Sequence, residues 1–194
     1  MAINIVIFAS GSGSNAEQLV KHFGQIDGIN VTGIFANKSN AYVLERAKNL
    51  NVPSEVFDRA AFKKESFLEI LEKYQADYLV LAGFLWKVPD YLIQAFPDKI
   101  INIHPALLPG YGGKGMYGEH VHNAVIANKE KQSGITIHLV NENYDEGRIL
   151  FQASCDISEN DTPDSLATKI HKLEHEYFPK IVEDYVRDML HADR

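Results

Sequence analysis

The sequence is poor in cysteine, in basic charge and in long apolar runs. Its one cysteine, Cys155, cannot form a disulfide within the chain, which is typical of a reducing compartment. The first ten residues lack the basic segment that begins a signal peptide. No apolar run approaches the roughly 18 residues needed to cross a bilayer. We therefore expect a cytoplasmic protein with no membrane partner.

Acidic residues outnumber basic ones by 26 to 19, which gives a formal net charge of -7. Proteins that bind nucleic acids normally present a basic stripe to the phosphate backbone, so no nucleic-acid partner is expected. A small phosphorylated ligand remains compatible with this charge, because a few backbone amides can hold one phosphate. The sequence contains no coiled coil or clear apolar patch from which the oligomeric state could be read; our expectation is a monomer or a weak homodimer.

The first half of the chain alternates short apolar runs with helical patterns, and its 194 residues suffice for one domain with a substantial core. The predicted strands are 3–8, 31–36, a short one at Val56, 77–82 and 99–103, and the predicted helices are 15–23, 42–49, 61–74 and 89–96. This alternation predicts a Rossmann-like α/β fold with a mostly parallel twisted sheet and helices on both faces.

The second half of the chain does not continue this regular alternation of strands and helices. Residues 105–118 contain two prolines and five glycines and are expected to form an irregular loop before a short helix at 120–128. Two further strands, 135–140 and 149–154, are joined by a turn around Asp145, so we expect an antiparallel strand in this part. A helix begins at Pro163, and Pro179 is expected to kink or divide it.

Ligands of open α/β sheets bind beyond the carboxyl ends of the strands, where residues 10–15 connect the first strand to the first helix. The glycines allow backbone amides to approach an anion. The spacing of Gly11, Gly13 and Ala16 also satisfies a dinucleotide fingerprint, but the acidic residue expected about twenty positions later is absent. Lys38 could meet a 2′-phosphate instead. We favour a single phosphate on a smaller substrate, and a purely structural turn is the remaining alternative.

Asn102 and His104 are two residues apart at the end of a strand, so their side chains project to the same side. An amide and an imidazole together can stabilise an oxyanion at an attacked carbonyl carbon. A nearby carboxylate would hold the imidazole charged, and Asp145 is the candidate. Asp145 as a plain turn residue, and His104 as a cap on the sheet edge, are the alternatives.

Other chemistries receive less support from the pattern. Four histidines with Asp145 could suggest a metal hydrolase, namely His104, His120, His122 and His138. The His-x-His spacing at a helix start differs from the i, i+4 spacing of helical zinc sites, so no metal is expected. Cys155 lies among apolar residues and is expected in the core. A non-enzymatic sugar-phosphate binding module remains an alternative to an enzyme.

Several motifs together resemble the phosphoribosylglycinamide formyltransferases, folate-dependent enzymes of purine synthesis. The resemblance covers nearly the whole chain, and its motifs are Ser10–Asn15, Asn37-Lys38, Leu81–Phe84, Asn102–Pro109, His120-Val-His122, Asp145 with Gly147 and Gln152, and Lys172–His175. It implies a single formyltransferase domain, 1–194, with a phosphate-binding Rossmann-like half at 1–100 and a catalytic and folate-binding half at 101–194.

The resemblance implies transfer of the formyl group of 10-formyltetrahydrofolate to the amine of glycinamide ribonucleotide, without a metal. Asn102, His104 and Asp145 match the catalytic positions. The phosphate would be held by Gly13, Ser14 and Asn15. Glu174 would accept hydrogen bonds from the amine or the ribose, and His171, where the family often has glutamine, would contact the phosphate.

The folate co-substrate is implied to bind Leu85, Trp86, Lys87 and Val88 together with Val140 and Asn141. Here the sequence departs from the family: Trp86-Lys87 stand where arginine and an apolar residue are common. The loop 110–118, which contains Lys114, is also longer and richer in glycine. Trp86 could stack on the folate or simply pack in the core, and Lys87 could meet its glutamate tail. Formyltetrahydrofolate hydrolase is the rival within the superfamily.

Overall fold

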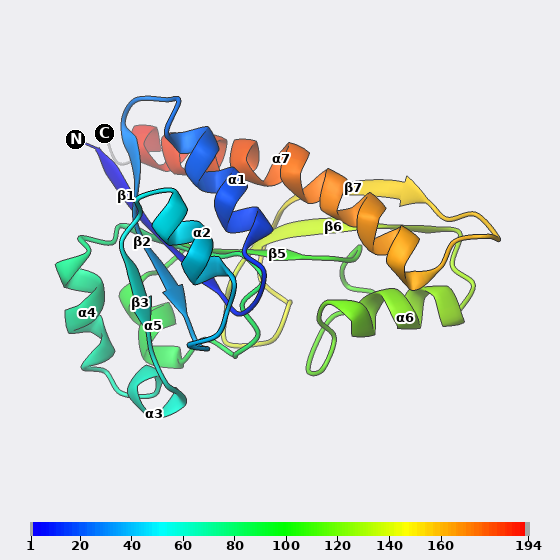
Figure 1. Ribbon diagram of the computed structural model, residues 1–194, viewed down its shortest axis with the longest axis horizontal. Helices are drawn as coiled ribbons and strands as arrows, with labels where there is room; N and C mark the ends of the chain where they lie inside the picture. Colours follow the sequence, from blue (N-terminus) through cyan, green and yellow to red (C-terminus); the bar gives the residue numbers. More distant parts are fainter. Residues whose placement is uncertain (1, 193–194) are drawn as a thin grey trace.

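The computed structural model describes residues 2–192, and its centre is one seven-stranded sheet in the order β3-β2-β1-β4-β5-β6-β7. The first five strands pair in parallel, and β6 and β7 run antiparallel to their neighbours (Figure 1). The strands are β1 (Ile3–Ala9), β2 (Ile29–Ala36), β3 (Ser54–Val56), β4 (Tyr78–Leu81), β5 (Ile100–His104), β6 (Gln132–Leu139) and β7 (Ile149–Asp156). This topology confirms the Rossmann-like fold and the antiparallel C-terminal part.

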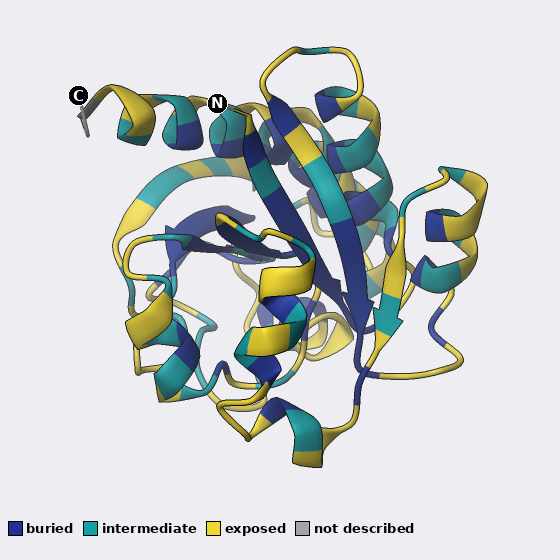
Figure 2. Ribbon diagram, turned by 90° about the vertical axis from the view of Figure 1, so that its left-hand side faces the viewer, coloured by how far each residue is buried: buried dark blue, intermediate teal, exposed yellow. Residues whose placement is uncertain are grey.

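Helices cover both faces of the sheet and enclose two apolar cores. The helices are α1 (Ser14–Phe23), α2 (Val43–Asn49), α3 (Arg59–Phe62), α4 (Phe67–Lys73), α5 (Asp90–Ala95), α6 (Glu119–Ala127) and α7 (Pro163–Ala192). One core lies between the sheet and α1, α2, α6 and α7, and the other contains the aromatic residues of α3 and α4. The central strands are buried because helices lie against both of their faces (Figure 2).

The prediction of a single helix over 61–74 is wrong, because this region forms two helices, α3 and α4. The carboxylate of Asp58 caps α3 by accepting from the amide of Ala61 at 2.7 Å. Phe62 and Phe67, five residues apart, would point to different sides of one continuous helix. The break at 63–66 lets both rings enter the same core, where they are 3% and 1% exposed.

The sequence predicted that Pro179 would kink or divide the last helix. Pro179 does not divide it, because α7 continues from Pro163 to Ala192. The buried stripe of α7 repeats every fourth residue on both sides of the proline and comprises Leu166, Ile170, Glu174, Phe178, Val182 and Val186. Its apolar members all pack into the same core, so tertiary packing holds the helix together across the missing hydrogen bond. Within residues 2–192, no helix is long and apolar enough to span a membrane.

Candidate active site

A cavity of about 660 Å³ opens at the carboxyl edge of the parallel strands. Its walls come from the loops after β1 and β4, from the loop between β5 and α6, from the loop between β6 and β7, and from α7. Every site residue predicted from the sequence lines it: Gly13, Ser14, Asn15, Leu85, Trp86, Lys87, Val88, Asn102, His104, Val140, Asn141, Asp145, His171 and Glu174. The fold therefore brings together residues from widely separated parts of the sequence.

The loop between β1 and α1 lies tightly against α2. Gly13 has φ 74°, and a Cβ there would lie 2.2 Å from Cγ2 of Val43, so this position requires glycine. The amide of Val43 donates to the carbonyl of Gly11 at 3.1 Å, and Arg46 Nε donates to the carbonyl of Ser12 at 2.8 Å. The loop is thus fixed with the N-terminus of the ten-residue helix α1 at the cavity wall, an arrangement that suits an anion.

Glu174 occupies a core position of α7 and yet faces polar groups. It is 5% exposed, and its Oε2 accepts from Nδ2 of Asn15 and from Nδ1 of His171, each at 2.9 Å. The hydrogen bond to Glu174 raises the pKa of His171. Oδ1 of Asn15 and Nδ1 of His122 are buried and have no hydrogen-bond partner among residues 2–192. These two atoms leave hydrogen-bonding capacity beside the loop between β1 and α1.

Asn102, His104 and Asp145 meet at the end of β5. Nδ1 of His104 lies 3.7 Å from Oδ2 of Asp145, and the side chains of the two residues are only 4% and 12% exposed. Nε2 of His104 donates to the carbonyl of Tyr111 at 2.8 Å. The amide of Gly113 donates to Oδ2 of Asp145 at 2.9 Å. An amide, an imidazole and a carboxylate therefore converge on one buried wall of the cavity.

The electrostatics of this group differ from the sequence-based prediction. Burial lowers the pKa of His104, and it outweighs the opposing effect of the nearby Asp145 carboxylate. The prediction that Asp145 keeps His104 charged near neutral pH is therefore wrong for the unliganded protein. Burial alone would raise the pKa of Asp145, but the neighbouring His138 and His104 and the amide of Gly113 together lower it. Asp145 is consequently ionised at neutral pH.

His138 is a site residue that the sequence reasoning considered only as a metal ligand. It pairs with Asn102 across β5 and β6, and Nδ1 donates to the carbonyl of Leu139 at 2.8 Å. With the ring proton on Nδ1, Nε2 can accept from Nδ2 of Asn102 at 3.1 Å, which orients the amide. Its other neighbour is Asp145, whose Oδ1 lies 3.6 Å from Nε2. The strand register that creates this pairing could not be deduced from the sequence.

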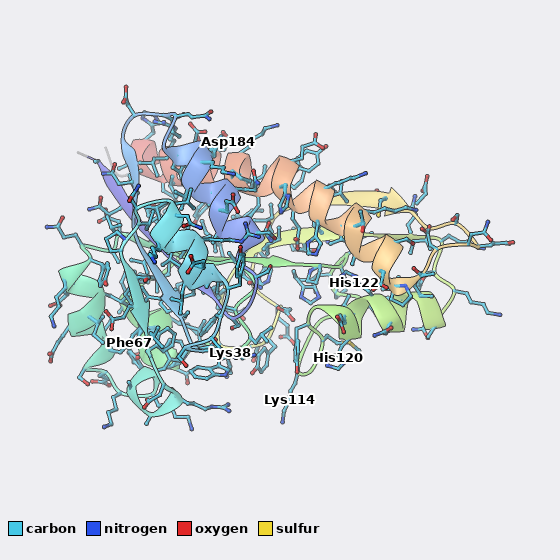
Figure 3. All side chains as sticks on the ribbon, in the orientation of Figure 1. Lys38, Phe67, Lys114, His120, His122 and Asp184 are labelled. Atoms are coloured by element: carbon cyan, nitrogen blue, oxygen red, sulfur yellow. The ribbon has the colours of Figure 1, made fainter. Side chains whose placement is uncertain are left out.

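His120 and His122, the other two histidines of the metal alternative, have different surroundings. His122 lies between α6 and α7 and lines the cavity, whereas His120 lies outside it against the ring of Tyr117 (Figure 3). Within the part of the chain that the structure describes, no group of three or more histidine, cysteine, aspartate or glutamate side chains is arranged to hold a metal ion.

The wall formed by residues 84–88 is apolar and aromatic. The ring of Trp86 packs against Phe57, Phe62 and Phe84 with centroid distances of 5.9, 6.0 and 6.1 Å, and it also borders the cavity. Trp86 therefore belongs to the aromatic core and presents part of its surface to the cavity. Lys87 is exposed at the cavity rim.

The fold and the cavity define a Rossmann-like α/β protein with a candidate anion-binding loop beside an amide, imidazole and carboxylate group. The chain belongs to the formyl transferase family, whose sequence profile matches residues 3–182. This confirms the family predicted from the motifs.

Named relatives narrow the similarity further. The chain is 41% identical over 187 residues to the chloroplastic phosphoribosylglycinamide formyltransferase of Arabidopsis thaliana, which covers 92% of this chain but 63% of that protein. It is 35% identical to the phosphoribosylglycinamide formyltransferase of Bacillus subtilis, over 91% of each chain. The crystal structure of the enzyme of that name from Anaplasma phagocytophilum matches with a TM-score of 0.88 and 30% identity, over 97% of this chain and 89% of that one.

Proposed function

We propose that this chain transfers the formyl group of 10-formyltetrahydrofolate to the amine of glycinamide ribonucleotide, a step of purine biosynthesis. The observation that carries the proposal is the single cavity in which the candidate phosphate loop and Glu174 lie with Asn102, His104 and Asp145. Phosphate binding and carbonyl chemistry are the two tasks that this substrate pair requires. The relatives named phosphoribosylglycinamide formyltransferase support the same reaction.

The proposed chemistry is a direct transfer. The substrate amine attacks the formyl carbon, a new carbon–nitrogen bond forms, and the bond from that carbon to the folate nitrogen breaks. Nδ2 of Asn102 has two N–H groups, of which one donates to His138, so the other can donate to the oxyanion. His104 accepts the proton of the attacking amine at Nδ1, is charged while the oxyanion exists beside it, and releases the same proton as the bond to the folate nitrogen breaks. Asp145 helps to move the amine proton to the folate nitrogen.

The substrate-binding roles follow the cavity wall. Gly13, Ser14 and Asn15 hold the phosphate, and Glu174 accepts from the amine or from ribose hydroxyls. The proposed division into a phosphate-binding half, 1–100, and a catalytic and folate-binding half, 101–194, is not strict, because His171 and Glu174 border the phosphate end. A fit to folate is supported by the cavity volume and by the aromatic surface of Trp86. Lys87 at the rim suits the folate's glutamate tail, and the pterin meets Leu85, Val88, Val140 and Asn141.

The decisive test is a formyl-transfer assay with both substrates, followed by omission of each. We expect formylated product only when both are present. Loss of the formyl group from folate without the amine acceptor would identify a formyltetrahydrofolate hydrolase instead. Retention of ribonucleotide binding without any turnover would indicate a binding module. The proposed reaction involves no nucleic acid, membrane or metal. A monomer or a weak homodimer would suffice for it. The cytoplasmic location stays a prediction.

The histidine at position 171 predicts a pH-dependent KM for the ribonucleotide. Because the pKa of His171 is raised from its ordinary value of 6.5, the imidazolium is present below the raised pKa and is lost as pH increases through it. If His171 contacts the phosphate, KM rises over that interval. His171→Gln abolishes this rise, measured as KM between about pH 6 and pH 9.

The phosphate titrates in both proteins with a pKa of about 6, so the difference between them isolates His171. Lys172→Gln, a loss of charge at the adjacent exposed position, is the matched control and keeps the wild-type profile. Identical profiles for wild type and His171→Gln contradict a phosphate contact by His171.

A further inference from the structure

Tyr111 connects His104 to the end of α6 through both its main chain and its side chain. Its carbonyl accepts from Nε2 of His104 at 2.8 Å. Its hydroxyl donates to Oε1 of Glu130 at 2.6 Å and accepts from Nδ2 of Asn128 at 2.9 Å. The residue has φ 56°, in the left-handed region that residues other than glycine rarely adopt. Anchoring of the side chain therefore helps to hold an unfavourable backbone conformation.

The carbonyl of Tyr111 decides which nitrogen of His104 carries the permanent proton. A carbonyl oxygen only accepts, so Nε2 is protonated in both the neutral and the charged ring. The neutral ring then has its lone pair on Nδ1, which lies 3.7 Å from Oδ2 of Asp145. Nδ1 is consequently the atom that gains and releases a proton.

Residues 111–113 also contact Asp145, the partner of His104. The amide of Gly113 donates to Asp145, and Gly112 lies between the two contacts. A Cβ on Gly112 would be 2.6 Å from Cδ2 of Leu108 and 3.3 Å from Cβ of Asp145, so the segment packs closely against the carboxylate. A shift of residues 111–113 would therefore change the positions of His104 and Asp145 together.

We propose that Tyr111 is a positioning residue: anchored by Glu130 and Asn128, it fixes His104 as the Nε2-protonated tautomer. The effect of Tyr111 on turnover rests on the formyl transfer proposed above. Its effect on the tautomer of His104 does not, because it can be measured in the protein without substrates. Asp145, His138 and Glu174 are the titratable groups that act on His104 directly. Glu130 and Asn128 act through Tyr111.

The test is Tyr111→Phe, which removes the anchoring hydroxyl and keeps the ring. We expect kcat to fall by about tenfold, because small displacements of a catalytic group lower the rate steeply, while KM for both substrates changes little. In ¹H–¹⁵N long-range NMR spectra of the unliganded protein at about pH 8, where His104 is neutral, its signals should move from the Nε2-protonated pattern toward a tautomer mixture. The His104 signals are assigned by their loss in His104→Asn.

Tyr74→Phe is the matched control. Its hydroxyl donates to Oε2 of Glu55 at 3.2 Å, away from the cavity, so kcat and the His104 signals should both stay unchanged. Thermal unfolding of both variants shows whether a fall in kcat or a change in the His104 signals reflects a loss of stability.

Changes at Glu130 test the anchor itself. Glu130→Gln retains an acceptor for the Tyr111 hydroxyl and should keep nearly wild-type kcat, whereas Glu130→Ala should lower it. Combining Tyr111→Phe with Glu130→Ala should add little to the loss in Tyr111→Phe, because both changes break the same hydrogen bond.

The inference is overturned if Tyr111→Phe keeps wild-type kcat, or if kcat falls while His104 remains entirely Nε2-protonated. The two proposals can be separated. A wild-type protein without formyl transfer, whose His104 still changes tautomer in Tyr111→Phe, would overturn the proposed function and support the positioning role.

Discussion

His104→Asn is expected to reduce kcat by about a thousandfold while the affinity for glycinamide ribonucleotide stays within a few fold of wild type. Loss of one oxyanion donor lowers rates by roughly 10² to 10³, and loss of proton transfer adds to this effect. The ribonucleotide's phosphate and ribose are proposed to bind elsewhere in the cavity, at residues 13–15 and Glu174. Steady-state kinetics and calorimetric titration of the ribonucleotide measure the two quantities separately.

His191→Asn is the control for this substitution, because His191 is exposed at the end of α7 and outside the cavity. It should match the wild type in both measurements. An equal loss of binding and turnover in His104→Asn would show that His104 serves binding or folding, and would refute its catalytic assignment.

Asp145→Asn should lower kcat by at least about a hundredfold, the second largest effect. The amide is nearly isosteric with the carboxylate, and its Oδ1 can still accept from the amide of Gly113, so the local geometry is retained. Only the negative charge and the capacity to accept a proton are lost. Because the pKa of Asp145 is lowered, the wild-type carboxylate is ionised throughout the neutral range, and the substitution removes its charge there.

The control for Asp145→Asn is Asp184→Asn, which removes the same charge from the exposed side of α7 (Figure 3). Single-turnover kinetics with saturating substrates measures the chemical step directly. A wild-type rate in Asp145→Asn would exclude Asp145 from proton transfer and leave it as the turn residue that its sequence position also allowed.

The sequence was sufficient for the fold because its signals are local and repeated. Apolar runs that alternate with amphipathic stretches indicate βαβ units, and the glycine-containing loop follows the first strand directly. Local patterns were misleading where packing decides. The helix predicted over 61–74 breaks so that Phe62 and Phe67 share one core, and α7 continues past Pro179 because residues on both sides of it are buried together.

In the candidate site, too, some features follow from neighbouring residues in the sequence and others only from the tertiary structure. The sequence alone determined the α/β class, the loop at 10–15 and the pair Asn102 and His104, because strand periodicity fixes which neighbouring side chains share a face. Asp145 was a candidate from the residues alone, and the motifs supported it and named the family.

Only the tertiary structure decided that His138 orients Asn102, that Tyr111 fixes the tautomer of His104, and that burial lowers the pKa of His104 despite Asp145. These features depend on antiparallel register, on loop conformation and on desolvation. Each arises from residues distant in the chain that pack together, which a pattern of neighbouring residues cannot encode.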